Sequence, residues 1–213
     1  MRDHFSEQLD LVFDDLAALA VSVQTAVRKA TEALANADGP VAEAVISGDA
    51  DIDARRDRIE EKCFRILSLQ QPVASDLRTV VAALRMGTEL ERSGDLATHV
   101  AKVARMRVPG RAVPDDLAPL VVRMAEIAVE MTGRCAEIIA GRDVAGLVAL
   151  GELDDEMDEL RTATLTSLVE GGSSNDVEVV IDLALISRYY ERIGDHAVSV
   201  AKRVAYVVTG DRP

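Results

Sequence analysis

The stretch that decides the fold of this chain is ERSGDLATHVAK at residues 91–102, because it returns one hundred residues later as ERIGDHAVSVAK at residues 191–202. Eight of the twelve positions are identical in the two copies. An internal repeat of this kind indicates that the chain is built from two copies of one structural unit. Each copy also places a Glu and an Asp four residues apart, so the repeat bears on chemistry as well as on fold.

The hydrophobic pattern around the repeat is helical. Between Leu9 and Val23, for example, apolar residues recur at intervals of three and four, which places them on one face of a helix. Clusters of Gly, Pro, Asn and Ser interrupt this pattern and are typical of helix boundaries. From them we predict helices over residues 4–36, 41–70, 73–108, 115–140, 143–170 and 176–208. Gly48 is an alternative point of interruption within the second of these helices.

The order of these helices predicts the fold class. No stretch shows the sustained alternation of a strand, so we expect an all-α protein. The longest irregular linker covers residues 109–114 and separates three helices from three, and the repeated motif lies in the third helix of each half. The sequence therefore predicts two pseudo-symmetric antiparallel three-helix bundles. Residues 1–110 form the first repeat and residues 111–213 form the second.

The composition restricts partners and location. The chain has 213 residues and only 3% aromatic residues, so Ala, Val and Leu must form most of its core. Its net charge of −13 would repel phosphate backbones, so we expect no nucleic-acid partner. Cys63 and Cys135 have no zinc or redox spacing and are expected to be buried thiols in a reducing cytoplasm. The sequence shows no secretion signal and no apolar run of about 18 residues, so we expect a cytoplasmic protein without membrane insertion.

The repeated motif gathers carboxylates in the first half. Residues four apart lie on the same face of a helix, so Glu91 and Asp95 project side by side. An antiparallel hairpin with its turn near residues 71–72 brings Asp49 and Asp53 of the preceding helix opposite them. We therefore expect these carboxylates to converge between two helices whose axes are about 8–10 Å apart.

The second half repeats this arrangement. Glu191 and Asp195 share a helix face. A turn near Ser173 brings acidic residues of the preceding helix opposite this pair. The residues within reach are Glu152, Asp154, Asp155 and Asp158.

Converging carboxylates call for a compensating charge. Each close pair repels by about 1 kcal/mol even in water. Hard cations such as Mg²⁺, Mn²⁺, Ca²⁺ and Fe³⁺ accept all-oxygen ligand sets, and the duplication of the set favours metal binding. Gly94 and Gly194 recur inside the helices, where a Gly costs about 0.5–1 kcal/mol relative to Ala, so we expect close approach of a partner helix there. The alternative is a pair of solvated acidic stripes that pair with Arg92, Lys102, Arg192 and Lys202.

No catalytic pattern accompanies the carboxylates. The Glu-x-x-His spacing of di-iron bundles is absent, and so are the P-loop and nucleophile-elbow motifs. His99 and His196 do not occupy equivalent positions in the two repeats, which argues against a shared ligand role. We therefore predict that the protein is not an enzyme and has no catalytic or organic-cofactor-binding residues.

The repeated pattern Glu-Arg-x-Gly-Asp-x-Ala, together with QPVASDLR at residues 71–78, resembles the PhoU family of accessory regulators of bacterial phosphate uptake and signalling. The resemblance covers nearly the whole chain as two PhoU-type three-helix repeats. It implies metal binding by Glu91 with Asp95 and by Glu191 with Asp195. The supplementary ligands that it implies on the preceding helices are Asp49, Asp53, Asp155 and Asp158.

Two further features bear on the resemblance. Four residues after the motif Asp, where the family often has Asn, this chain has His99 in the first repeat and Ser199 in the second. The two sites are therefore not expected to be equal. The abundance of Ala, Val, Asp and Arg suits a GC-rich genome such as that of an actinobacterium.

The family resemblance also implies a function. It implies a negative regulator of phosphate uptake and phosphate-starvation signalling, an adaptor between the ATPase of a phosphate ABC transporter and a sensor histidine kinase. The implied cofactor is a hard metal ion, Mg, Mn or Fe, and a homodimer is an alternative to a monomer. The alternative functions are a metal-dependent phosphohydrolase, which would use the acidic clusters to activate water, and a purely structural helical bundle.

Overall fold

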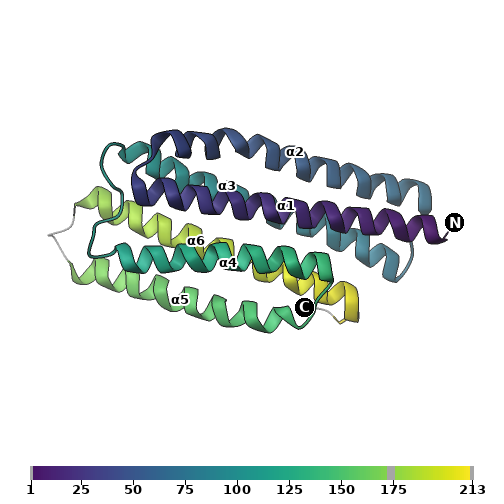
Figure 1. The fold of residues 1–213 in the computed structure, drawn as a ribbon. Helices are drawn as coiled ribbons and strands as arrows, with labels where there is room; N and C mark the ends of the chain where they lie inside the picture. Colours follow the sequence, from purple (N-terminus) through teal and green to yellow (C-terminus); the bar gives the residue numbers. More distant parts are fainter. Residues whose placement is uncertain (1, 172–175, 212–213) are drawn as a thin grey trace.

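A computed structural model describes residues 2–171 and 176–211 of the chain. These residues form six α-helices and no strand (Figure 1), so the all-α prediction is confirmed. The helices are α1 (Arg2–Asn36), α2 (Gly39–Gln70), α3 (Ser75–Arg107), α4 (Ala118–Gly141), α5 (Gly146–Glu170) and α6 (Val177–Thr209). The expected turn near Ser173 lies outside the described residues.

Side-chain caps begin two of the helices. The Asp38 side chain accepts a hydrogen bond of 3.0 Å from the Val41 amide at the start of α2, and Pro40 occupies the first turn. Asp176 begins α6 in the same way, by accepting from the Glu178 amide at 3.0 Å. Both caps satisfy amide groups that have no partner within the helix. The predicted starts of these helices are therefore correct to within two residues.

Helices α4 and α5 begin three residues later than the sequence predicted, at Ala118 and Gly146. The delay at α5 has a local cause. The Asp143 side chain accepts a hydrogen bond of 2.9 Å from the Ala145 amide, a turn that competes with helix formation. The residues from 143 to 145 therefore belong to the connection.

Helix α2 continues through Gly48 without a break, so the alternative of an interruption there is wrong. A Cβ atom added at Gly48 would meet no other atom within 4 Å. The cost of this glycine is therefore only its conformational freedom in the unfolded chain.

We expect Gly48→Ala to raise the free energy of unfolding by about 0.5–1 kcal/mol, because alanine is the better helix former and fits the open space. Urea denaturation followed by circular dichroism measures the change. Gly94→Ala is the matched control, because its added Cβ would lie only 3.0 Å from Ile52 Cδ1. It should gain less stability or lose some. An unchanged or lower stability of Gly48→Ala would contradict a continuous helix with open space at this position.

The two halves pack side by side (Figure 1). Helix α1 packs on α4 and helix α3 packs on α6, so these four helices form the middle of the molecule. Helix α2 packs on α1 and α3, and helix α5 packs on α4 and α6. Helices α2 and α5 therefore lie on opposite sides of the molecule.

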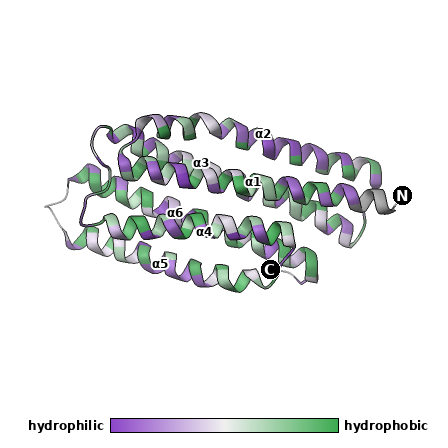
Figure 2. Ribbon diagram, in the orientation of Figure 1, coloured by the Kyte–Doolittle hydropathy of each residue, from purple (hydrophilic) through white to green (hydrophobic). Residues whose placement is uncertain are grey.

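A single hydrophobic cluster runs through both halves. Figure 2 shows apolar residues along all six helices, interspersed with hydrophilic ones. The largest fully buried side chains come from every helix, and they are Leu16, Leu19, Ile59, Met86, Met124, Ile127, Met131, Ile139, Leu150, Met157, Leu183 and Tyr190. The linker at residues 109–114 still leaves three helices in each predicted repeat, but the buried side chains of the two repeats contact one another.

Both cysteines lie in this core, as expected. Burial raises the pKa of the Cys63 thiol and of the Cys135 thiol to about 12, so both stay protonated at neutral pH. None of the described helices combines the length and the apolarity that crossing a bilayer requires.

Candidate functional site

The first carboxylate cluster lies between α2 and α3, beside a tight contact of the two helices. A Cβ atom added at Gly94 would lie 3.0 Å from Cδ1 and 3.1 Å from Cγ2 of Ile52. An added methyl group would therefore require the Ile52 side chain to shift by a few tenths of an ångström. The close approach brings Asp49 and Asp53 of α2 toward the motif residues of α3, as the hairpin register predicted.

The pKa values of this cluster show that its carboxylates repel one another. Burial raises the pKa of Asp49, a hydrogen bond with Thr98 opposes the rise, and the charges of Asp95 and Asp53 add to it. Burial also raises the pKa of Glu91, again with repulsion from Asp95 and Asp53. One oxygen of Asp49, Oδ1, is buried and has no hydrogen-bond partner among the described residues. A buried carboxylate oxygen without a donor is costly unless a cation or a proton reaches it.

The second cluster lies between α5 and α6. Burial raises the pKa of Glu191, and the charge of Asp195 raises it further. Burial likewise raises the pKa of Asp154, with repulsion from Asp195, Asp158 and Asp155. A Cβ atom added at Gly194 would lie 3.1 Å from the sulfur of Met131 and 3.5 Å from Asp154 Oδ1.

Asp154 is half-buried, whereas Asp155 and Asp158 are exposed. The sequence placed Asp154 within reach of the motif, but the family resemblance implied Asp155 and Asp158 as ligands. The spacing of apolar residues along the helix could have identified Asp154 as the inward-facing residue. Asp154 lies four residues after the buried Leu150 and three before the buried Met157, so it shares their inward face.

The two clusters differ in how cations compensate them. Arg188 forms an ion pair with Glu191 in the second cluster. In the first cluster Arg56 binds Asp57 at 3.0 Å and Glu60 at 2.9 Å, and it only lowers the pKa of Glu91 from a distance. The first cluster is therefore the less compensated of the two.

The alternative of solvated, ion-paired stripes is not what the structure shows. Among residues 2–171 and 176–211, the four expected cations form no ion pair; they are Arg92, Lys102, Arg192 and Lys202. Lys102 and Lys202 act at longer range, by lowering the pKa of Asp49 and of Asp154.

The carboxylates do not form a closed metal cage. Within the part of the chain that the structure describes, no three Asp, Glu, His or Cys side chains are grouped so that they could hold a metal ion. Like charges favour side-chain conformations that point apart, and a multivalent cation would favour the opposite. The metal sites therefore stay a prediction, supported by two coupled acidic clusters.

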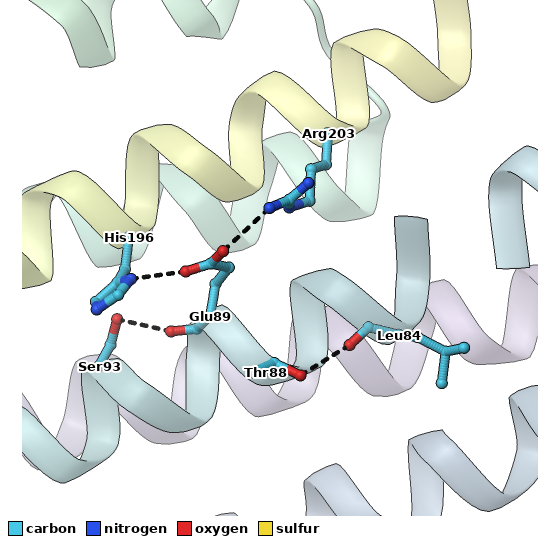
Figure 3. A network of polar contacts seen from close by, with 6 residues as sticks. All are labelled: Leu84, Thr88, Glu89, Ser93, His196 and Arg203. Atoms are coloured by element: carbon cyan, nitrogen blue, oxygen red, sulfur yellow. Dashed lines mark hydrogen bonds and ion pairs between the residues drawn. The ribbon is translucent and has the colours of Figure 1, made fainter. Parts of the chain in front are cut away.

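A polar network that the sequence did not reveal joins the two halves (Figure 3). Glu89 of α3 lies between two residues of α6. Its Oε2 is 2.7 Å from His196 Nδ1, and its Oε1 accepts a hydrogen bond of 3.1 Å from Arg203. Only 15% of the Glu89 side chain and 11% of the His196 side chain are exposed. The network therefore fixes α3 against α6, and it gives His196 a structural role.

A second ion pair joins the same two helices. Arg107 near the end of α3 donates from Nε to Asp182 at 2.5 Å, and from Nη1 to Glu178 at 2.5 Å. Only 4% of the Asp182 side chain is exposed. A buried charge of this kind destabilises the fold unless it is paired, so Arg107 is the residue that makes Asp182 tolerable inside the interface.

Glu89 and Glu91 have opposite pKa shifts, although they are two residues apart. Burial alone raises the pKa of Glu89, but the hydrogen bonds from Arg203 and His196 outweigh it and lower the pKa overall. The pKa of Glu91 is raised, first by burial and then by Asp95. The two glutamates should therefore affect stability in opposite directions.

In metal-free buffer at about pH 7 we expect Glu89→Gln to lower the free energy of unfolding and Glu91→Gln to raise it. The folded pKa of Glu89 lies below its unfolded value, so its stabilisation exists above about pH 4.5 and is lost as the pH falls through the folded pKa. The folded pKa of Glu91 lies above its unfolded value, so ionised Glu91 destabilises the fold. The difference in unfolding free energy between Glu91→Gln and the unmodified chain should shrink as the pH falls toward the raised pKa of Glu91.

Urea denaturation in steps between about pH 4 and pH 8 measures both curves. The two variants serve as controls for each other, since each removes one carboxylate from the same helix. Shifts of the same sign at pH 7 would contradict the opposite environments of the two residues.

The fold and the clusters define a class of protein, in which a three-helix unit is duplicated and each third helix carries the Glu-Arg-x-Gly-Asp motif. The family model described as the PhoU domain matches residues 16–104 and again residues 121–204. The chain belongs to the PhoU family, as its repeated motif predicted.

Several relatives match over the full length of the chain. It is 38% identical over 213 residues to the "Phosphate-specific transport system accessory protein PhoU homolog 2" of Mycobacterium tuberculosis, with 100% of both chains covered. It is 33% identical to the homolog 1 protein of the same species, with 100% of this chain and 96% of the relative covered. These mycobacterial relatives agree with the actinobacterial origin that the composition suggested.

The fold matches a crystal structure of PhoU from Pseudomonas aeruginosa. The TM-score is 0.89 at 30% sequence identity, and the match covers 97% of this chain and 100% of the other. The structure of the phosphate transport system regulatory protein PhoU from Streptococcus pneumoniae has a TM-score of 0.88 at 22% identity, with 98% of this chain and 99% of the other covered. The predicted PhoU-like helical bundle is therefore confirmed.

Proposed function

We propose that this protein is an accessory regulator of a phosphate-specific transport system, and that it represses phosphate uptake and phosphate-starvation signalling when phosphate is plentiful. The observation that carries the proposal is the full-length match, at 38% identity, to a protein named as an accessory protein of that system. Both chains are covered completely, so the relationship includes every helix and not a single module.

The proposed mechanism is docking in the cytoplasm. The partners are the ATPase of the phosphate ABC transporter and a sensor histidine kinase, which the protein would hold in its repressing state. Long rigid helices whose outer faces carry charge suit this role, and the continuous core would let a contact on one half constrain the other. Catalysis is no part of the proposal.

The proposal includes a hard metal ion at each acidic cluster. In the first half the ligands would come from Glu91, Asp95, Asp49 and Asp53. In the second half they would come from Glu191, Asp195 and the α5 residues Asp154, Asp155 and Asp158. The raised pKa values and the unpartnered Asp49 Oδ1 support this donor set, and all-oxygen donors suit Mg²⁺, Mn²⁺ or Fe³⁺. The ion would supply positive charge that holds the paired helices together.

Deletion and complementation test the regulatory role. Because Mycobacterium tuberculosis has both a homolog 1 and a homolog 2, the test strain should lack every family member of its host. We expect a phosphate-starvation reporter to become active in phosphate-rich medium, and this chain to restore repression. A reporter that stays silent in the deletion strain, or that stays active after complementation, would rule out the proposed role.

A further inference from the structure

An open groove lies beside the Glu89 network, between the first turns of α3 and the last turns of α6. Its volume is about 690 Å³. Three arginines, one aromatic ring and two larger aliphatic side chains line it: Arg78, Arg85, Arg203, Tyr206, Leu77 and Val81. Among residues 2–171 and 176–211, no Asp or Glu lines the groove, although the chain as a whole has a net charge of −13. The positive charge of this groove is therefore a local exception.

The arginines form a line along the groove. Arg78 Nη2 donates to the Val207 carbonyl at 3.3 Å, and Arg203 donates to Glu89 at 3.1 Å, so α3 and α6 run antiparallel here. This register places Arg203 of α6 at a height between Arg78 and Arg85 of α3. Seven residues separate the two α3 arginines, which corresponds to about 10 Å along the helix axis.

Two of these guanidinium groups have no carboxylate partner within the part of the chain that the structure describes. Arg78 lies over the Tyr206 ring, with its Cζ atom 5.4 Å from the ring centroid, and its Nε is buried without a hydrogen-bond partner among the described residues. Arg85 is exposed and forms no ion pair with any described residue. The ring and the carbonyl hold Arg78 in place without neutralising it.

The groove also exposes apolar surface between its charges. Leu77 is 41% exposed and Val81 is 37% exposed. Val81 lies three residues after Arg78 and four before Arg85, and Leu77 lies four residues before Val81, so apolar and cationic side chains share one face of α3. A ligand that matches this face needs both carboxylates and an apolar side chain.

We propose that this groove docks an acidic, amphipathic segment of a partner protein, with carboxylates about two helical turns apart and an apolar side chain between them. The proposed adaptor function identifies this partner as a phosphate-signalling protein, so that part of the proposal rests on the proposed function. Inorganic phosphate is too small to reach arginines about 10 Å apart at once. A second copy of this chain is disfavoured because each copy has a net charge of −13.

Photo-crosslinking in cells tests the occupant of the groove. A photoreactive benzoyl-phenylalanine replaces Leu77 in the full chain, and the same group at Val148, which is 71% exposed on α5, is the control. We expect Leu77 alone to yield a crosslink to an acidic segment of another protein, identified by mass spectrometry. A crosslink to lipid, to a second copy of this chain or to a segment without Asp and Glu would overturn the proposal, and so would the absence of a crosslink.

Charge reversal tests the chemistry of the contact. The crosslinked segment is synthesised as a peptide, and its affinity for the full chain is measured by fluorescence anisotropy. Arg85→Glu should weaken binding by about tenfold or more, and high salt should weaken it as well. A peptide with Lys at the facing acidic position should regain affinity for Arg85→Glu. Arg58→Glu makes the same charge change at an exposed position on α2 and should leave binding unchanged.

Equal affinity of Arg85→Glu and Arg58→Glu for the peptide would overturn the proposal. A second result would also overturn it. If the unmodified chain binds vesicles of equal phosphatidylcholine and phosphatidylglycerol, and Arg85→Glu abolishes this binding, the groove is a membrane-binding site. Circular dichroism checks that Arg85→Glu is folded, and Arg78→Gln provides a second variant in the same groove.

The reporter assay separates this inference from the proposed function. If the unmodified chain restores repression and Arg85→Glu does so equally well, the groove proposal fails and the regulatory role stands. If the unmodified chain does not restore repression, the regulatory role fails, and the peptide measurements still decide whether the groove binds an acidic segment.

Discussion

Replacing Tyr190 by alanine is expected to lower the free energy of unfolding by about 3–5 kcal/mol, the usual cost of removing a buried aromatic ring. Tyr190 is fully buried. Its hydroxyl lies 2.9 Å from the Thr31 hydroxyl, so this side chain of α6 also reaches α1 in the other half. A loss of this size is a large fraction of the about 5–15 kcal/mol that keeps a typical protein folded.

The continuous core predicts that the loss of Tyr190 affects both halves of the molecule. Because the buried residues of both halves form one cluster, we expect Tyr190→Ala to loosen α1 and α3 as well as α4 and α6. Urea denaturation measures the stability, and hydrogen exchange with mass spectrometry shows which helices lose protection. Loss of protection in the second half alone would show that the halves unfold independently.

Tyr190→Phe is the matched control. It keeps the ring and removes only the hydroxyl, so we expect a loss of about 1 kcal/mol. Thr31 is not left without a partner, because its hydroxyl also donates to the Val27 carbonyl at 2.9 Å. Equal losses in the phenylalanine and alanine variants would mean that packing of the ring contributes little.

The second large effect is expected from metal ions at the first carboxylate cluster. In EDTA, the double variant Glu91→Gln/Asp95→Asn should be more stable than the unmodified chain, because it removes the partly buried charge and the repulsion from Asp95 that together raise the pKa of Glu91. With Mn²⁺ at one hundred times its dissociation constant, the unmodified chain should gain about 2.7 kcal/mol, because the ion binds only the folded state. The double variant should gain much less, so the order of stability should reverse.

Thermal and urea denaturation with and without Mn²⁺ measure this reversal. The control variant Asp51→Asn/Glu61→Gln removes two exposed carboxylates of α2 and should respond to Mn²⁺ like the unmodified chain. The equivalent second-half variant, Glu191→Gln/Asp195→Asn, should show a smaller response, because Arg188 already pairs with Glu191. An unmodified chain that gains no stability from Mn²⁺, Mg²⁺ or Fe³⁺ would remove the metal sites from the proposed function.

Much of the first cluster could be predicted from the sequence because helical register is a local property. The turn near residues 71–72 and the helical rise together place Asp49 and Asp53 opposite Glu91 and Asp95. The pKa shifts show that these residues interact. In the second half the same reasoning found the right segment of α5, but the buried neighbours Leu150 and Met157 decide which of its carboxylates turns inward.

The contacts between the halves could not be predicted in this way. Glu89 and His196 are 107 residues apart, and neither belongs to a pattern that distinguishes an interface residue from a surface residue. The groove has the same origin, since Arg203 joins Arg78 and Arg85 only because α6 lies against α3.

The sequence by itself determined the six helices, the duplication and the family, because apolar periodicity, turn residues and a repeated motif act over short stretches of chain. Only the tertiary structure decided that the two three-helix units share one core, that a buried glutamate joins them and that arginines gather in one groove. The physical reason is that packing between distant helices depends on the fit of whole surfaces, which no local pattern of residues specifies.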